Sequence, residues 1–274
     1  MEKRDKKQRQ SATVAAREDR VGTVRKGGLG TSAKGSHKTR TITIVQVVLA
    51  VIAVAGVVWL ASKMIGYGQA RQAYDDIKRA YASELDSTTD PYESPIDFEA
   101  LQKDYPNVVA WLAMDDMDVS YPIVQGEDNE YFLHYDPSGN ESIDGSIFLD
   151  SRNSPDFEDL HTLVYGHNMI DGSMFGLLDQ YVDEEFYKNA TGMFTIYTPE
   201  AAFRYQIFAV DIVDPTDAVY QVGFKNPQVF GAFVAQLLEN SMYQTGVKAS
   251  GKDHVVTLST CSSSDRLVIS AKRV

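Results

Sequence analysis

The only cysteine of the chain lies close to an arginine, and these two residue types could carry out nucleophilic chemistry together. The C-terminal segment reads HVVTLSTCSSSDRLVISAKRV, in which Cys261 and Arg266 are separated by residues 262–265. The thiolate form of cysteine is the nucleophile, and a nearby positive charge favours it over the thiol. The planar donors of a guanidinium also suit the oxyanion that forms when a carbonyl carbon becomes tetrahedral. This pair indicates cysteine-dependent acyl transfer.

Two strands and a tight turn should position the pair. Residues 254–261 and 266–271 are rich in β-branched and apolar side chains, and the polar residues 262–265 form a turn between them. Pairing outward from the turn sets Cys261 opposite Arg266, Thr260 opposite Leu267, Ser259 opposite Val268 and Leu258 opposite Ile269. Directly opposed residues have Cβ atoms about 4.5–5.5 Å apart. The register therefore predicts a guanidinium beside the thiol.

A cysteine nucleophile also needs a proton donor for its leaving group, and imidazole is the usual choice. The chain has five histidines: His37, His134, His161, His167 and His254. The first lies in the basic tail described below, and His134 is typical of a surface residue. His254 precedes Cys261 on one predicted strand by about 23 Å, at about 3.3 Å per residue. His161 opens another predicted strand and His167 ends it, next to turn residues. The position favours His167, with His161 as the alternative.

A lone cysteine has three possible roles on the outer side of a membrane, where thiols are normally paired. It is an inert buried residue, an intermolecular link or a nucleophile. No H-E-x-x-H, C-x-x-C or phosphate-loop pattern occurs, and the acidic stretches 115–118 and 127–130 do not match a calcium loop. We therefore expect no cofactor and no metal.

The charge of the chain is divided between a basic tail and an acidic body. The 274 residues carry a net charge of -12, yet residues 1–40 hold 12 Lys and Arg against 4 Asp and Glu. Few apolar residues accompany these charges, so we expect a disordered tail over residues 1–40. The acidic body lacks the clustered Lys and Arg that phosphate neutralisation needs, which excludes nucleic acid as a partner.

An uncharged segment of 22 residues, 41–62, follows the tail. About 20 such residues span a bilayer as a helix. The apolar region of a cleaved signal peptide is shorter, about 7–15 residues, so we expect an uncleaved anchor over residues 41–66, with signal cleavage as the alternative. Because the excess of Lys and Arg lies on its N-terminal flank, the tail should be cytoplasmic and the remainder extracellular, in a single-pass protein of the cell membrane.

The remaining chain divides into helical and strand-like parts. Residues 67–104 form an N-terminal helical segment, with an amphipathic stripe over 67–85 and a short helix over 96–103. From residue 105 to 274 many short strands predict a mostly β barrel or sandwich. These strands cover residues 108–114, 119–124, 145–149, 162–165, 193–197 and 203–213, besides the two of the C-terminal hairpin. Helices are expected over 173–181 and, between the late strands, over 226–242.

Several motifs resemble one enzyme family, the sortases, and within it class B. They are TLSTC ending at Cys261, VYGHNM around His167, and the segments IDFEALQKDYPNVVAWLAM, SYPIVQGEDNEYFLHYD and GSIFLDSRN. The resemblance covers roughly residues 67–274. It implies a closed β-barrel with N-terminal helices, which would be the catalytic domain of a cysteine transpeptidase on the outer face of a Gram-positive cell membrane.

By motif, the resemblance also implies residue roles and partners. Cys261 would attack a threonine carbonyl in the C-terminal sorting signal of a surface protein, His167 would protonate the departing amine, and Arg266 would hold the substrate carbonyl and oxyanion. A peptidoglycan precursor amine would then resolve the acyl-enzyme. Further residues occupy motif positions that line the substrate groove: Ser259, Thr260, Tyr165 and Asn129. Many class B members have a longer loop between the cysteine and the arginine than the four residues found here.

Three other functions stay open at this point. A pilin-polymerising sortase would use a lysine as acceptor, although no lid-like segment precedes the predicted barrel. A cysteine peptidase would transfer the same acyl group to water. A membrane-tethered binding protein without enzymatic activity would leave the thiol unreactive.

Overall fold

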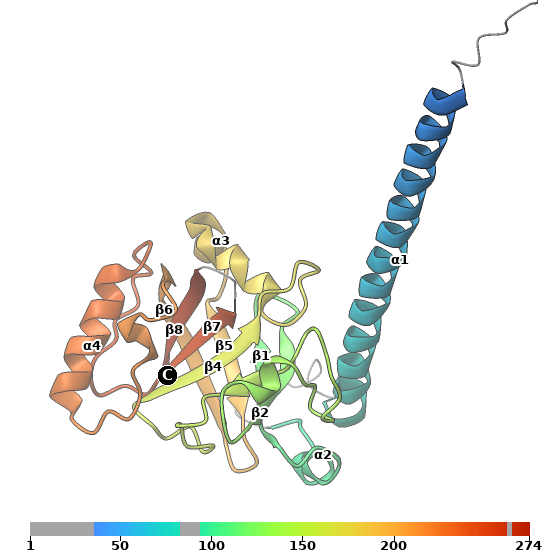
Figure 1. Cartoon of the computed structure of the whole chain (residues 1–274). Helices are drawn as coiled ribbons and strands as arrows, with labels where there is room; N and C mark the ends of the chain where they lie inside the picture. Colours follow the sequence, from blue (N-terminus) through green and yellow to red (C-terminus); the bar gives the residue numbers. More distant parts are fainter. Residues whose placement is uncertain (1–35, 83–93, 262–264) are drawn as a thin grey trace, which may run out of the picture. The chain divides into compact units, whose positions relative to one another are not determined.

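A closed barrel of eight strands forms the centre of the described chain (Figure 1). The computed structural model describes residues 36–82, 94–261 and 265–274, with Cys261 described by its backbone. The strands follow the order β1-β2-β3-β4-β7-β8-β6-β5 around the barrel. Their bounds are β1 (Val108–Met114), β2 (Ser120–Gln125), β3 (Ile147–Leu149), β4 (His161–His167), β5 (Met193–Tyr197), β6 (Ala202–Val213), β7 (Val255–Cys261) and β8 (Arg266–Arg273). The prediction of a mostly β, closed barrel is confirmed.

Alternation along the strands fills the barrel with apolar side chains. Val256 and Leu258 of β7 belong to one core cluster with Leu267 and Ile269 of β8. Successive residues of a strand point to opposite faces, so every second position supplies the interior, except where the register of β6 shifts between Ile207 and Ala209. Leu258, Leu267 and Ile269 therefore face the interior, and the opposite face of β7 is available for other contacts.

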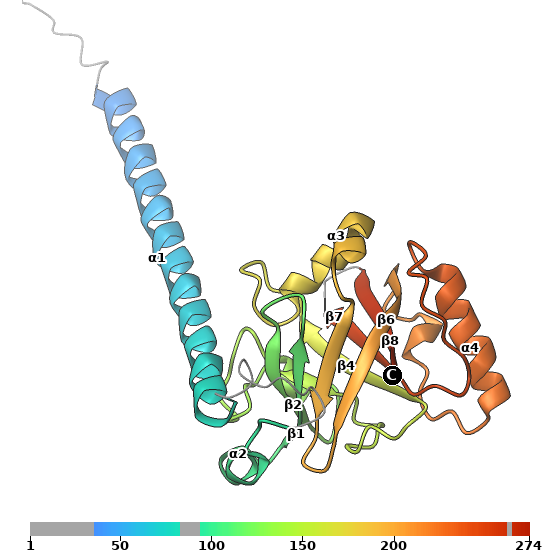
Figure 2. The same ribbon diagram turned by 180° about the vertical axis from the view of Figure 1, so that it is seen from behind.

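The described residues also form four α-helices and three 3₁₀ segments. The α-helices are α1 (Ser36–Tyr81), α2 (Phe98–Asp104), α3 (Glu184–Asn189) and α4 (Pro227–Asn240), and the 3₁₀ turns are η2 (Tyr131–Leu133), η3 (Gly176–Val182) and η4 (Ala218–Tyr220). Asn226 caps α4 through hydrogen bonds from Gln228 and Val229, and Pro227 occupies its first turn. This helix lies beside β6, outside the barrel, in both Figure 1 and Figure 2.

The helix expected over residues 173–181 differs from the observed structure. A 3₁₀ segment, η3, covers most of this range, and the separate helix α3 follows it. Asp183 explains the division, because its side chain accepts a hydrogen bond from the backbone of Glu185 and so begins a new helix. Asp183 thus separates the 3₁₀ segment η3 from the helix α3.

The chain divides into two compact units, residues 1–55 and 56–274. In the first unit α1 begins at Ser36, within the tail that the sequence predicts to be disordered, while residues 1–35 lie outside the described residues. The stretch Ile44–Ser62 of α1 is long and apolar enough to cross a membrane, and none of it is buried. In the second unit Tyr74 and Ile77, near the end of α1, are buried in two core clusters. The stretch 86–95 between the two predicted helices falls mostly on residues 83–93, which are not described.

Candidate active site

Parallel pairing of β4 with β7 brings His167 and Cys261 together at one end of the barrel. The ladder runs from His161 opposite Val255 through Tyr165 opposite Ser259 to His167 opposite Cys261. Neighbouring strands are about 4.8 Å apart, so the backbones of the two residues are adjacent. Both strands end at these positions. The predicted nucleophile and the predicted proton donor therefore occupy one register position at one barrel edge.

The hairpin of β7 and β8 has the predicted register as far as it is described. The pairs include Leu258 opposite Ile269 and Ser259 opposite Val268. Residues 262–264 of the turn lie outside the described residues. Arg266 begins β8, and its Nη1 lies 3.5 Å from the carbonyl oxygen of Thr260, the residue before Cys261. The guanidinium is thus turned toward the end of β7. The observed pairs of the hairpin end at Ser259 opposite Val268, so the pairing of Cys261 with Arg266 stays a prediction.

A backbone carbonyl orients the imidazole of His167. Its Nε2 lies 2.8 Å from the carbonyl oxygen of Leu133, in η2. A carbonyl only accepts hydrogen bonds, so Nε2 is the donor in this contact and Nδ1 is the ring nitrogen left available for another partner. Gly145, at φ 54°, packs against Leu133, and a Cβ atom there would lie 2.6 Å from this carbonyl oxygen. A glycine is therefore required behind the orienting group.

The alternative histidine, His161, has a structural role. Its side chain is fully buried, with Nδ1 2.7 Å from the carbonyl oxygen of Gln221 and Nε2 2.9 Å from the hydroxyl oxygen of Thr257. Burial lowers the pKa of His161 to about 4, although the bond to Gln221 acts in the opposite direction. A neutral ring held by two partners in the core is unsuited to proton exchange with a substrate. This geometry favours His167, which ends the same strand.

Two of the predicted substrate-binding residues meet on a buried carboxylate, Asp150. The Nδ2 of Asn129 donates to this carboxylate at 3.0 Å, and the Tyr165 hydroxyl donates at 2.9 Å. Arg152 completes the group with bonds of 2.8 Å from Nε and 2.7 Å from Nη2. Burial alone would raise the pKa of Asp150, but the hydrogen bonds from Arg152 and Tyr165 hold it below its usual value. The Asp150 side chain is therefore an ionised acceptor that fixes both residues.

Tyr220 connects this group to β7. Its ring stacks on that of Tyr165 with a centroid separation of 6.3 Å, and its hydroxyl lies 3.0 Å from Oγ of Ser259. The Nη2 of Arg152 also donates to the Tyr220 carbonyl at 3.3 Å. The segment around η4 is thus attached to β4 and β7 within two residues of His167 and Cys261. We call Asn129, Asp150, Arg152, Tyr165, Tyr220 and Ser259 the carboxylate network.

The predicted roles of Ser259 and Thr260 as groove-lining side chains are not supported by their burial. Both residues are fully buried. Oγ1 of Thr260 accepts a hydrogen bond of 3.0 Å from the backbone of Leu267, on the core side of β7. Ser259 contacts Tyr220 instead of facing solvent. In the TLSTC motif these two residues hold the strand end in place, and only Tyr165 and Asn129 remain partly exposed.

Sequence reasoning missed three groups at this site: the Leu133 carbonyl, Asp150 with Arg152, and Tyr220. The segment GSIFLDSRN contains the aspartate and the arginine, but its letters do not reveal that the carboxylate is buried. A backbone carbonyl has no signature in the sequence at all. Tyr220 lies between the predicted strand 203–213 and the predicted helix 226–242, where the sequence predicts no element.

We expect the substitution Asp150→Asn to destabilise the folded barrel. Five hydrogen bonds from the described residues end on this carboxylate, and bonds to charged groups are worth about 1.5–3 kcal/mol each. The free energy of unfolding should fall by roughly 2–4 kcal/mol, and the KM for peptide should rise more than kcat falls. Urea titration and steady-state kinetics measure both. The exposed Glu200→Gln is the matched control, and an unchanged Asp150→Asn would contradict this role.

Comparison with known proteins decides the family. Residues 112–274 match the model of the sortase domain. The chain belongs to the sortase family. The sortase is 36% identical to sortase B of Listeria monocytogenes over 207 residues, which cover 73% of this chain and 83% of that protein. It is 28% identical to sortase B of Staphylococcus aureus over 238 residues, covering 85% and 96% of the two chains.

Solved structures agree with this assignment. The sortase matches sortase B of Bacillus anthracis in complex with AAEK1 with a TM-score of 0.68 and 32% identity, covering 77% of this chain and 99% of that one. It matches a Staphylococcus aureus sortase B–substrate complex with a TM-score of 0.70 and 25% identity, covering 77% and 98%. The predicted family, class B and cysteine transpeptidase type are confirmed.

Proposed function

We propose that this sortase cleaves a C-terminal sorting signal after a threonine and joins the acyl-threonine to an amine of the cell wall. The observation that carries the proposal is the register of β4 and β7, which sets His167 opposite Cys261 at the strand ends. Arg266 begins the next strand, with its guanidinium turned toward this position. This arrangement supports the roles of Cys261 as nucleophile, His167 as proton donor and Arg266 as oxyanion donor.

In the first half-reaction the Cys261 thiolate attacks the carbonyl carbon of the threonine. The resulting oxyanion is stabilised by the guanidinium of Arg266. As the intermediate collapses, the carbon–nitrogen bond breaks and His167 donates a proton to the departing amine. A thioester between Cys261 and the threonine remains, and the C-terminal fragment leaves.

In the second half-reaction an amine attacks the thioester carbonyl. His167, now neutral, accepts the proton of the attacking amine, and the thiolate of Cys261 is the leaving group. The new amide bond joins the threonine to the acceptor. Because Nε2 of His167 is held by Leu133, we assign both proton transfers to Nδ1.

Product analysis separates this function from a cysteine peptidase. Purified enzyme is incubated with a library of peptides that share a threonine, with and without an added amine, and the products are separated by mass. A transpeptidase forms the amide adduct when the amine is present, while a peptidase forms the free acid under both conditions. Preference for lysine side chains over cell-wall peptide amines would instead indicate the pilin-polymerising alternative.

We expect Arg266→Lys to be severely impaired although the charge is kept. An ammonium is a point charge and lacks the planar fork with which a guanidinium holds an oxyanion and a carbonyl together. Loss of one oxyanion donor lowers kcat by about 10²–10³-fold. Turnover is measured together with the pH dependence of Cys261 alkylation, which reports the thiolate fraction. If lysine restored near wild-type turnover, the role of Arg266 would be limited to stabilising the Cys261 thiolate.

The proposed location is the cell membrane, with the N-terminus in the cytoplasm and the barrel outside. The apolar stretch Ile44–Ser62 and the basic residues before it support this orientation. External protease added to intact cells should digest a tag placed after residue 274 and leave an N-terminal tag uncut. Protection of the C-terminal tag would indicate the opposite topology. Release of the barrel into the medium would indicate a cleaved signal.

A further inference from the structure

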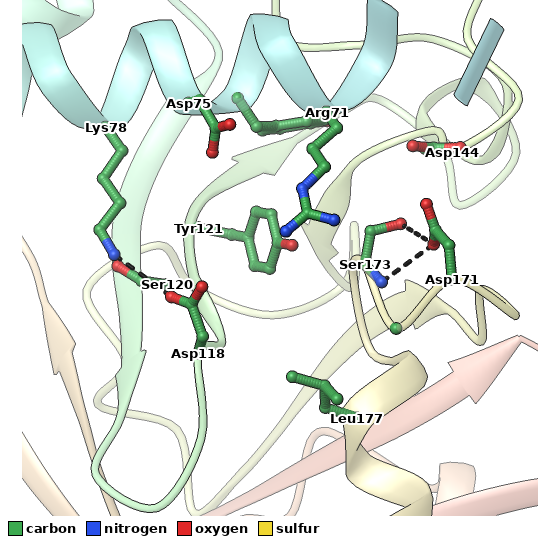
Figure 3. A pocket seen from close by; sticks show the side chains of 12 residues that line it. Arg71, Asp75, Lys78, Asp118, Ser120, Tyr121, Asp144, Asp171, Ser173 and Leu177 are labelled. Atoms are coloured by element: carbon green, nitrogen blue, oxygen red, sulfur yellow. Dashed lines mark hydrogen bonds and ion pairs between the residues drawn. The ribbon is translucent and has the colours of Figure 1, made fainter. Parts of the chain in front are cut away.

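A cavity of about 300 Å³ lies in the second unit of the chain, between α1, the turn before β2 and residues 171–177 (Figure 3). No residue of the proposed catalytic site lines it. Four carboxylates and two basic side chains do: Asp75, Asp118, Asp144, Asp171, Arg71 and Lys78. Lys78 is paired with Asp118 at 3.4 Å. Side chains of both charges thus line one cavity, and its volume is in the range of small-molecule binding sites.

Asp144 is the feature that points to a ligand. The residue is fully buried, and neither carboxylate oxygen has a hydrogen-bond partner among the described residues. Figure 3 shows its carboxylate at the same end of the cavity as that of Asp171. Burial, and secondarily the charge of Asp171, raise the pKa of Asp144 to about 6. An isolated buried carboxylate is costly unless a donor or a positive charge satisfies it.

The middle of the cavity offers donors. The guanidinium of Arg71 reaches into the cavity beside the ring of Tyr121 in Figure 3. The Tyr121 oxygen accepts a hydrogen bond of 3.1 Å from the backbone of Met174, which leaves its own proton to donate. Burial raises the pKa of Tyr121 to about 12, so its hydroxyl keeps this proton at neutral pH. A ligand with an anionic or carbonyl oxygen fits here.

We propose that this cavity binds a zwitterionic ligand of the amino-acid or short-peptide class. Its ammonium group lies between Asp144 and Asp171, and its carboxylate faces Arg71 and Tyr121. An ammonium group supplies three donors to two carboxylates. A divalent metal fits less well, because calcium takes six to eight oxygen ligands. The described residues contain no group of three or more His, Cys, Asp or Glu side chains able to hold a metal.

The walls of the cavity adjoin the groups that hold His167. Residues 171–173 belong to the loop that follows this histidine, and Phe175 donates from its backbone to the His167 carbonyl at 2.9 Å. On the other side Asp144 precedes Gly145, which packs on the Leu133 carbonyl. Ligand binding should therefore change the environment of His167 although the ligand does not contact it.

Nuclear magnetic resonance titration with alanylalanine tests the proposal, since this dipeptide carries both charges. The expected result is saturable shifts of the amide signals of residues 171–173. The imidazole signals of His167 should shift over the same range of dipeptide concentration. N-acetyl-alanylalanine, which lacks the ammonium group, should bind at least about tenfold more weakly, because a charge-assisted hydrogen bond is lost. Equal binding of the two dipeptides would overturn the ammonium assignment.

Variants locate the site. Asp144→Asn and Asp171→Asn should each weaken binding about tenfold, while the exposed Glu239→Gln on α4 should not change it. Asp171 is exposed, so its variant keeps the proposal testable if Asp144→Asn fails to fold. Unchanged binding in Asp171→Asn, or calcium chloride shifting the same signals where the dipeptide does not, would overturn the proposal. Because binding alone is measured, the result is independent of the proposed transpeptidation.

Discussion

Cys261→Ala should abolish both acyl transfer and peptide hydrolysis while the barrel stays folded. Each half-reaction passes through the thioester, so no route remains once the sulfur is removed. Loss of a nucleophile of this kind lowers kcat by on the order of 10⁴-fold or more. Product formation is followed by mass at high enzyme concentration, so that a residual rate is detectable.

The fold of this variant distinguishes a nucleophile from a structural thiol. Cys261 ends β7, and the core of that strand is supplied by Val256 and Leu258. We therefore expect a melting temperature within a few degrees of the wild type, as for substitutions outside the core. A large loss of stability with retained turnover would assign Cys261 to the structural alternative.

His167→Ala should remove nearly all turnover of peptide substrates. A positioned general acid and base contributes about 10²–10⁴-fold, and His167 is proposed to fill both roles. A substrate with a leaving group that needs no proton, such as an activated ester, should lose much less activity with the same variant. Single-turnover kinetics of the two substrates measure this difference.

Two other histidines serve as controls for this prediction. His134 is exposed and should tolerate alanine without effect on turnover. His161→Gln should lower stability, because the residue has two buried partners, but the folded fraction should retain activity. Equal losses of turnover for His161 and His167 variants would defeat the assignment of the proton donor.

Local patterns were enough to predict the hairpin that carries the cysteine. β-branched runs on both sides of a polar turn fix the register of β7 and β8, and the pair Leu258–Ile269 is observed. The pairing of β4 with β7 could not be predicted in this way. These strands are parallel and distant in sequence, so their register depends on the closure of the whole barrel.

The burial of two carboxylates also could not be predicted from the sequence. Asp144 and Asp150 stand in one short segment among turn residues, where carboxylates are normally solvated. Both residues are fully buried, but the Asp150 carboxylate accepts five hydrogen bonds and the Asp144 carboxylate accepts none from the described residues. Only the packing of α1, η2 and the residues after β3 reveals this difference.

Direct detection of the acyl-enzyme tests the central claim, that Cys261 is the nucleophile of a transpeptidase. The wild-type enzyme is mixed with a threonine-containing sorting peptide, quenched in acid and analysed by intact mass and peptide mapping. We expect a mass increase equal to the N-terminal peptide fragment on Cys261, no such adduct in Cys261→Ala, and loss of the adduct with formation of an amide when an amine is added. Amide formation without any adduct on Cys261, or an adduct on another residue, would contradict the account.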